Sequence, residues 1–216
     1  KSNLFQSQKL RCGDVEKGFA ESDLIVEEVF RTQYTEHATI EPQVSLAVPG
    51  KDGRITVYSP CSRPFGIQRE VARALRLPQN RVRAISTTGG GGFGGKNEPL
   101  QEPTLAILAM KTGCPVRGLF SREEEFVAST IRHSFIMYYR SGVLRSGRIL
   151  ARHIRMIADT GAYCGVDSNA SGKAALTKAV LAAAGPYRIP NVYAEGFAVY
   201  TNHPIANSMR GPGVTQ

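Results

Sequence analysis

A glycine-dense stretch, residues 87–97 (TTGGGGFGGKN), constrains this chain more than any other part of its sequence. Six of the chain's 22 glycines fall within it. Each glycine gives up backbone freedom on folding, so a cluster this dense indicates that something must approach bare backbone where Cβ atoms would clash. Phe93 is the only large side chain inside the glycine run.

The segments on either side of the stretch predict a strand, a turn and a helix. Residues 81–86 (RVRAIS) are strand-like, and residues 99–110 (PLQEPTLAILAM) are typical of a helix. Amides in the turn and at the helix start have no partner within the helix, which favours an anionic group at this place.

A tight turn without a ligand would need fewer glycines than this stretch contains. Two short motifs within the stretch offer alternatives to such a turn. Gly90 to Lys96 satisfies GxxxxGK, but Asn97 stands where a phosphate loop needs Ser or Thr for magnesium. Gly90, Gly92 and Gly95 satisfy the dinucleotide pattern GxGxxG, but the acidic residue expected about 20 residues later is missing. Neither match is therefore specific evidence for a phosphate loop or a dinucleotide-binding site.

The composition is that of an ordinary globular protein, with 42% hydrophobic and 21% charged residues in 216. No apolar run is long enough to span a bilayer. The cysteines form no CxxC pair, which argues against a zinc knuckle, an iron–sulfur cluster or a disulfide scaffold and favours a reducing, cytoplasmic compartment; they are Cys12, Cys61, Cys114 and Cys164.

The formal net charge of +9 indicates an anionic cofactor or an acidic neighbouring subunit. The basic residues are scattered, and aromatic residues do not alternate with them as in a base-stacking surface. Nucleic-acid binding is therefore not expected.

The pattern along the chain predicts an α+β fold of β-hairpins and βαβ-like units. Residues 1–10 carry no clear pattern and predict a linker, and residues 11–216 are expected to form part of one domain. The predicted helices are residues 13–22, 64–75, 99–110, 121 onward and 173–184; the predicted strands are residues 24–31, 44–48, 54–58, 81–86, 116–120, 134–144, 149–158 and 192–200. A loop is predicted over 159–172, where Asp159 would hold the turn.

Taken together, several segments resemble the molybdenum hydroxylases, the family of xanthine oxidase and aldehyde oxidase. The glycine stretch resembles the family motif GGGFGGK, and residues 208–216 (SMRGPGVTQ) resemble its FRGFGxPQ loop. Residues 36–41 (EHATIE), 159–163 (DTGAY) and 187–191 (YRIPN) resemble further family segments in the same order. The resemblance covers roughly residues 10–216 and implies the first part of a molybdopterin-binding domain.

This resemblance implies a molybdenum–molybdopterin cofactor with a phosphate or dinucleotide tail, the cytosine dinucleotide form being one option. It also implies hydroxylation of an aromatic heterocycle or an aldehyde with water as the oxygen source. Iron–sulfur clusters and FAD would lie on partner domains or subunits. No protein side chain ligates the metal in this family, so no metal-ligand cluster is expected, and neither a nucleic-acid nor a membrane partner is implied.

The family's cofactor-binding residues carry over to two segments. Gly92, Phe93 and Gly94 match the residues whose backbone lies at the molybdenum, and Arg210 and Gly211 match the loop beside the cofactor. Without the resemblance, Phe93 would be an ordinary core residue and Arg210 a solvated loop residue.

Four positions depart from the family pattern. Ser62 stands where many members have a cofactor-binding glutamine, and Asn97 where purine-oxidising members have a substrate-binding glutamate. Lys178 replaces a substrate-orienting arginine without its planar fork of donors, and Pro212 replaces an aromatic residue that stacks on substrate. These changes argue against xanthine itself. For Asn97 and Lys178, purely structural roles in a helix start and on an exposed helix are equal alternatives.

The family's general-base glutamate belongs to a segment that has no match in this sequence, so no catalytic residue is assigned. The chain is therefore expected to be a fragment or a natural split subunit, inactive alone. Its partners would be the remaining molybdopterin-binding segment, an iron–sulfur subunit and a flavin subunit. Two alternatives stay open: a phosphate or nucleotide-binding module using residues 89–96, and a scaffold with a degenerate, empty site.

Overall fold

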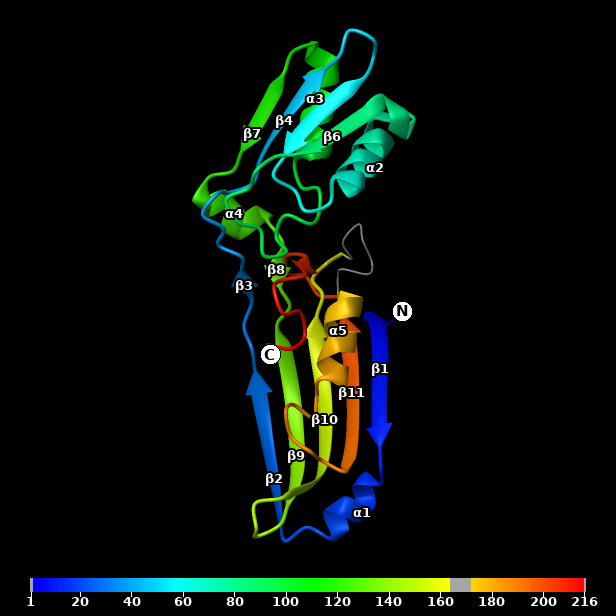
Figure 1. Ribbon diagram of the computed structural model, residues 1–216, viewed down its shortest axis with the longest axis vertical. Helices are drawn as coiled ribbons and strands as arrows, with labels where there is room; N and C mark the ends of the chain where they lie inside the picture. Colours follow the sequence, from blue (N-terminus) through cyan, green and yellow to red (C-terminus); the bar gives the residue numbers. More distant parts are fainter. Residues whose placement is uncertain (1, 164–171, 216) are drawn as a thin grey trace. The chain divides into compact units, whose positions relative to one another are not determined.

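The computed structural model describes residues 2–163 and 172–215. The chain forms two compact units, one from residues 1–35 and 131–216 and the other from residues 36–130. Both contain helices and β-sheet, which confirms the predicted α+β class (Figure 1). The sequence had indicated a single domain portion, because nothing in its composition marks the two points where the chain passes between the units.

A five-stranded sheet in the order β1-β11-β10-β9-β2 forms the first unit (Figure 1). The predicted hairpin is confirmed, since β9 and β10 pair antiparallel, while β11 runs parallel to β10. The strand bounds are β1 Leu4–Cys12, β2 Leu24–Arg31, β9 Phe135–Val143, β10 Ile149–Asp159 and β11 Asn191–Val199.

The prediction of a linker over residues 1–10 was wrong. Leu4–Cys12 forms β1, which pairs antiparallel with β11, with Leu10 opposite Ala194. Phe5 and Leu10 also pack against the buried core of this unit. The strand is stabilised by a partner distant in the sequence, and its local pattern is too polar to reveal it.

Helix α5 (Gly172–Leu181) covers part of one face of this sheet and buries Leu176 and Val180 against it (Figure 1). Gly196 permits the close approach, because a Cβ there would lie 2.6 Å from Leu176 Cδ1. Helix α1 (Val15–Ala20) begins at Asp14, whose side chain accepts from the Lys17 amide at 3.0 Å, as the sequence predicts. The predicted loop over 159–172 lies largely outside the described residues.

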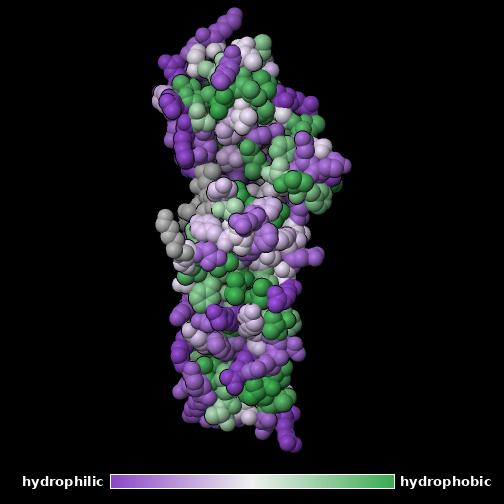
Figure 2. All heavy atoms as spheres, turned by 180° about the vertical axis from the view of Figure 1, so that it is seen from behind, coloured by the Kyte–Doolittle hydropathy of each residue, from purple (hydrophilic) through white to green (hydrophobic). Residues whose placement is uncertain are grey.

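The opposite face of the sheet carries apolar and charged side chains side by side (Figure 2). The Arg155 guanidinium lies 5.4 Å from the centre of the Phe197 ring, and Arg11 lies 5.6 Å from that of Tyr193. Arginine stems therefore cover part of the aromatic surface on this face.

The second unit contains a four-stranded sheet in the order β6-β5-β4-β7 with a separate apolar core. The predicted hairpin is β4 and β5, and helix α2 connects β5 to the parallel strand β6. The predicted capping box of α4 is present, with Ser121 and Glu124 as reciprocal partners. The bounds are β4 Val44–Pro49, β5 Ile55–Ser59, α2 Pro64–Leu75, η1 Gln79–Arg81, β6 Val82–Ser86, α3 Glu102–Thr112, β7 Val116–Leu119 and α4 Arg122–Ala128.

Three two-residue strands complete the description: β3 (Thr35–Glu36), β8 (Ile131–Arg132) and β12 (Ala206–Asn207). β8 and β12 pair in parallel within the first unit, which ties the segment before residues 208–215 to the segment that precedes β9. None of the helices in the described ranges is long and apolar enough to cross a membrane.

Candidate functional site

The glycine stretch forms an irregular turn after β6, and its backbone is left-handed at Gly91, Phe93 and Gly94. Phe93 has a φ of 51°, which is uncommon for a residue with a side chain, and its side chain is 46% exposed. A bulky residue held in this conformation at an exposed turn is an outlier of the kind that clusters at functional sites.

Glu41 holds the first half of this turn. Its Oε2 accepts from the Gly90 amide at 3.0 Å and from Lys96 Nζ at 2.7 Å, and its own amide donates to the Gly90 carbonyl at 3.2 Å. Burial alone would raise the pKa of Glu41, but the bonds from Lys96 and Gly90 and the lysine charge outweigh it and lower that pKa. Lys96 is only 3% exposed, so its ammonium group points into the protein.

Some of the glycines serve the protein's own packing. A Cβ on Gly90 would lie 2.6 Å from Glu41 Cβ, and one on Gly95 would lie 2.8 Å from His37 Cγ. The Gly95 carbonyl also accepts from Gln43 Nε2 at 3.0 Å. The sequence interpretation that the whole run leaves space for a ligand is therefore too broad.

Gly92 differs from these glycines, because a Cβ there would meet nothing closer than 3.9 Å. One of those 3.9 Å neighbours is Ser62 Oγ, so the structure brings Ser62 to the glycine turn. Asn97 also belongs to it, since its amide donates to the Gly94 carbonyl at 3.3 Å. The turn is held by hydrogen bonds that the amides of Gly90, Gly95 and Asn97 donate. Within the described residues, the amides of Gly92, Phe93 and Gly94 donate no hydrogen bond that holds the turn.

The start of α3 does not offer the anion site that the sequence predicts. The helix begins at Glu102, three residues later than expected, and Glu102 itself is 3% exposed. Its carboxylate accepts from the Leu100 amide at 2.9 Å and from the hydroxyls of Ser45 at 3.0 Å and Ser59 at 2.7 Å. The protein's own carboxylate thus occupies the place beside the helix start.

In the first unit, Arg132 holds the loop of residues 208–215. Its Nη2 donates to the Arg210 carbonyl at 2.6 Å, and its Nη1 donates to Thr215 Oγ1. Burial lowers the pKa of Arg132. The loop backbone is therefore fixed at Arg210 while the Arg210 side chain is exposed.

The same loop packs against α5. Gly213 has a φ of 76°, and a Cβ there would lie 2.0 Å from the Ala175 carbonyl oxygen and 2.7 Å from the Ala179 amide. Pro212, which precedes it, is half-buried, and Gly211 has a φ of 73°. Lys178 lies on this helix and is exposed, so the helix that carries Lys178 and the loop that carries Pro212 are packed together.

Sequence reasoning missed a cluster around Asp159. Asp159 Oδ2 lies 2.6 Å from both Tyr34 Oη and His203 Nδ1, and Oδ1 accepts from Thr201 Oγ1 at 2.7 Å and from the Gly161 amide at 2.8 Å. Burial would raise the pKa of Asp159, but these hydrogen bonds lower it. The expectation that Asp159 holds its turn is confirmed, and its other partners are too distant in the sequence to be predicted.

His133 is buried beside this cluster, 2% exposed, with no hydrogen-bond partner for Nε2 among the described residues. Burial, aided by the charge of Arg132, lowers its pKa to about 4 despite the opposing effect of Asp159. The histidine is therefore neutral in the folded protein at neutral pH. In the described ranges, no three His, Cys, Asp or Glu side chains form a group that could hold a metal ion.

The candidate residues divide between the two units. The second unit carries Ser62, Gly92, Phe93, Gly94 and Asn97; the first carries Lys178, Arg210, Gly211 and Pro212.

Comparison with known proteins identifies close relatives along the whole chain. A family model described as the molybdopterin cofactor-binding domain matches residues 1–216. The chain is 37% identical over 215 residues to the nicotinate dehydrogenase large molybdopterin subunit of Eubacterium barkeri, covering 100% of this chain and 49% of that subunit. It is 38% identical over 214 residues to a probable xanthine dehydrogenase subunit of Bacillus subtilis (strain 168), covering 99% and 28%.

Solved structures show the same fold. The aldehyde oxidoreductase from Desulfovibrio gigas matches with a TM-score of 0.84 at 28% identity, over 98% of this chain and 23% of that one. The quinoline 2-oxidoreductase from Pseudomonas putida 86 matches with a TM-score of 0.88 at 24% identity, over 98% and 27%, which shows the fold alone. The chain thus spans 49% of the length of one relative and 28% of the other.

Proposed function

Because this chain belongs to the molybdopterin cofactor-binding domain family, we propose that its glycine turn and its Arg210 loop bind the molybdopterin cofactor of a xanthine dehydrogenase-like molybdenum hydroxylase. The observation that carries the proposal is the exposed, left-handed turn at Phe93. In residues 2–163 and 172–215, the amides of Gly92, Phe93 and Gly94 donate none of the hydrogen bonds that hold that turn. They are therefore available to an anionic ligand.

The residues present fit such a group. A turn in which left-handed residues recur winds the backbone so that neighbouring amides can face one anion. Gly92 leaves the space beside Ser62 open, because a Cβ there would contact nothing closer than 3.9 Å. Arg210, held in place through its carbonyl, supplies a planar cationic donor suited to phosphate or oxyanion groups. When bound, the cofactor supplies the redox centre for hydroxylating an aromatic heterocycle or aldehyde with water as the oxygen source.

In this proposal, the residues of the chain bind and orient. The backbone amides at Gly92, Phe93 and Gly94 would donate to the oxyanion side of the cofactor, and Ser62 would donate through its single hydroxyl, whereas an amide side chain offers two N–H donors. Asn97, Lys178 and Pro212 are the substrate positions. The name of the nicotinate dehydrogenase relative suggests an anionic heterocycle, for which Lys178 would provide a single positive charge.

We extend the proposal to the whole enzyme. The general-base glutamate, the iron–sulfur clusters and the flavin would come from other segments or subunits, so the chain alone would be inactive. The cytosine dinucleotide form of the cofactor and a cytoplasmic location belong to the same proposal. General-base catalysis typically contributes about 10²- to 10⁴-fold, so a chain without its base would lose at least that factor.

The phosphate-module alternative is less favoured by the geometry. A phosphate loop needs its lysine to reach the phosphates, whereas Lys96 Nζ is bonded to the Glu41 carboxylate and carbonyl. The start of α3 is likewise occupied by Glu102. Calorimetric titration of the chain with ATP and magnesium separates the two proposals: tight binding would favour the phosphate module, and no heat of binding is expected here.

Metal and pterin analysis of the enzyme purified with this chain in place tests the proposal directly. We expect molybdenum and a pterin in equal amounts, close to one each per copy of the chain. A fully assembled complex without either would contradict the proposal and favour the degenerate scaffold.

A further inference from the structure

Strand β2 is an edge of the five-stranded sheet, since β9 is the only strand beside it among the residues that the structure describes (Figure 1). It pairs with β9 over Leu24 to Arg31 without a register shift. A long, regular edge strand can pair with another extended chain, and proteins usually protect such edges with charges, bulges or covering segments.

The direction of the backbone groups of β2 follows from one hydrogen bond. The Thr32 amide donates to the Phe135 carbonyl at 2.9 Å, directly after the strand and in the same register. Because facing groups alternate in an antiparallel ladder, the even-numbered residues point their amides and carbonyls at β9. The odd-numbered residues then point theirs outward, and these are Ile25, Glu27, Val29 and Arg31.

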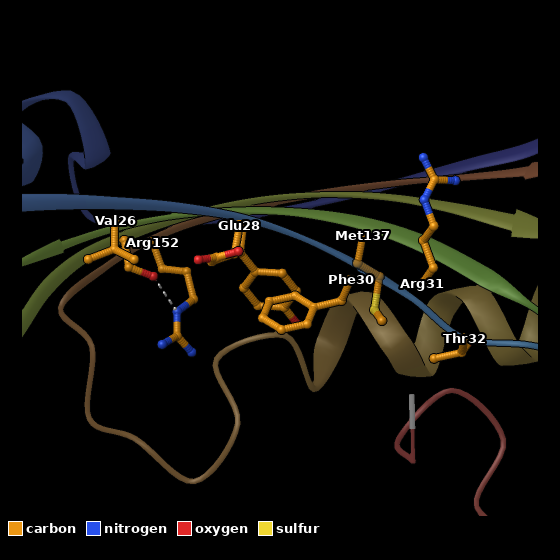
Figure 3. Close-up of a pocket in the computed structure, with 9 residues that line it drawn as sticks. Val26, Glu28, Phe30, Arg31, Thr32, Met137 and Arg152 are labelled. Carbon is orange, nitrogen blue, oxygen red and sulfur yellow. Dashed lines mark hydrogen bonds between the residues drawn. The ribbon is translucent and has the colours of Figure 1, made fainter.

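A groove of about 530 Å³ lies along the α5 side of this edge. Val26 and Phe30 contribute exposed apolar surface from β2, being 41% and 51% exposed. Behind them, the Phe30 ring packs edge-on against Tyr139 at 5.4 Å between centroids, with Met137 beside it. Figure 3 shows Glu28 between Val26 and Phe30 along the strand.

The charge of Glu28 is not matched by an ion pair within the part of the chain that the structure describes. Arg152, which also lines the groove, donates instead to Ser141 Oγ and to the Ala184 carbonyl, each at 3.3 Å. On the other face of the strand, Glu27 is already paired with Arg140 at 3.1 Å. On the side of the groove, the open edge thus presents an apolar, an acidic and an apolar side chain at alternate positions, namely Val26, Glu28 and Phe30.

A second copy of β2 does not complement this edge. If two copies paired antiparallel through their outward-facing residues in the register with fullest overlap, Ile25 would face Arg31 and Glu28 would lie directly opposite the other Glu28. Like charges directly opposite each other in a strand pair are destabilising.

We propose that β2 is a docking site for an extended segment of a partner polypeptide, which adds as an antiparallel strand. The segment carries, at alternate positions, an apolar, a basic and an apolar side chain, and these lie opposite Phe30, Glu28 and Val26. Its backbone bonds to the outward groups of Ile25, Glu27, Val29 and Arg31, and its apolar side chains fill the groove.

Two fluorescein-labelled peptides test this proposal by anisotropy with the chain: Thr-Val-Thr-Lys-Thr-Ile-Thr, and the same peptide with Glu in place of Lys. We expect the Lys peptide to bind at least about fivefold more tightly, because its charge opposes that of Glu28. Glu28→Lys should reverse the preference. Equal binding of both peptides, or no binding of either, would overturn the proposal.

A second pair of variants tests the backbone pairing. Val29→Pro removes an outward amide while leaving the pairing with β9 intact, so it should weaken the Lys peptide at least about fivefold. The matched Val29→Ala, which keeps the amide, should bind nearly as the parent chain does. Circular dichroism confirms that both variants are folded. Unchanged binding by Val29→Pro, or a homodimer in light scattering that Val29→Pro dissociates, would overturn the proposal.

Discussion

Lys96 Nζ lies 2.7 Å from Glu41 Oε2, and the lysine side chain is 2% exposed. The pair links the second half of the glycine turn to the segment before β4 and also fixes Gly90. A lysine that resembles the phosphate ligand of a nucleotide loop is therefore the internal support of this turn.

Removing Glu41 should destabilise the second unit more than removing Lys96. Glu41→Ala leaves a buried ammonium without its partner and should lower the free energy of unfolding by about 3 kcal/mol. Lys96→Met leaves a carboxylate that is 31% exposed and can be hydrated, so its cost should be about 1 kcal/mol. Urea denaturation followed by circular dichroism gives both values, and the reverse order would contradict the structural role assigned to the pair.

The buried His133 predicts a loss of stability in mild acid. Its pKa is 6.5 when unfolded and about 4 in the folded protein, so below pH 6.5 the unfolded chain takes up a proton that the folded chain refuses. Stability should therefore fall by about 2 kcal/mol between pH 7 and pH 5. The lowered pKa values of Glu41 and Asp159 act only below their ordinary 4.5 and 3.8.

Urea midpoints measured at pH 7, 6 and 5 check this dependence. His133→Leu should be nearly flat over that range, whatever its absolute stability. The same slope in the parent chain and in His133→Leu would assign the effect to other groups.

Gly213 and Gly147 form a matched pair of left-handed glycines. Both have positive φ, 76° and 84°, but a Cβ on Gly147 would meet nothing within 4 Å, whereas one on Gly213 would overlap the backbone of α5. Gly147→Ala should cost only the conformational penalty of about 1 kcal/mol. Gly213→Ala should cost at least about 3 kcal/mol, because the loop must move away from the helix. Equal costs in thermal unfolding would show that the loop does not depend on this contact.

Within the glycine turn, Gly90 and Gly92 should respond oppositely to alanine. Gly90→Ala places Cβ 2.6 Å from Glu41 Cβ and should destabilise by about 1–3 kcal/mol. Gly92 is not left-handed and has open space, so Gly92→Ala should stabilise by about 0.4–1 kcal/mol by restricting the unfolded chain. Thermal melting of both variants decides the matter, and a strongly destabilised Gly92→Ala would show that this space is needed for folding.

Local patterns were sufficient to predict most of the elements. β2 and α2 have the predicted bounds, and the Asp14 cap of α1 is confirmed, because alternation, helical periodicity and capping are encoded within a few residues. β1 was missed because its stability comes from pairing with β11.

The candidate site also divides into residues that local patterns predict and residues that depend on partners distant in the sequence. The resemblance implied that Ser62 and the glycine stretch with Gly92 and Phe93 serve one cofactor, and the structure brings Ser62 to the glycine turn. The supporting groups were not predicted, because Glu41, Arg132 and His203 meet their partners only through the fold: Glu41 is 55 residues from Lys96, and His203 is 44 residues from Asp159. A pattern within one segment carries no information about such contacts.

The molybdenum and pterin content of purified enzyme carrying Gly92→Val tests the central claim most directly. The side chain would fill the open space beside Ser62, and we expect cofactor content to fall at least tenfold while the circular dichroism spectrum is unchanged. Gly66→Val, at a glycine that is likewise not left-handed and where a Cβ would meet nothing closer than 3.7 Å, is the matched control and should keep its cofactor. Full cofactor content in the Gly92→Val enzyme would contradict the assignment of this turn as the cofactor site.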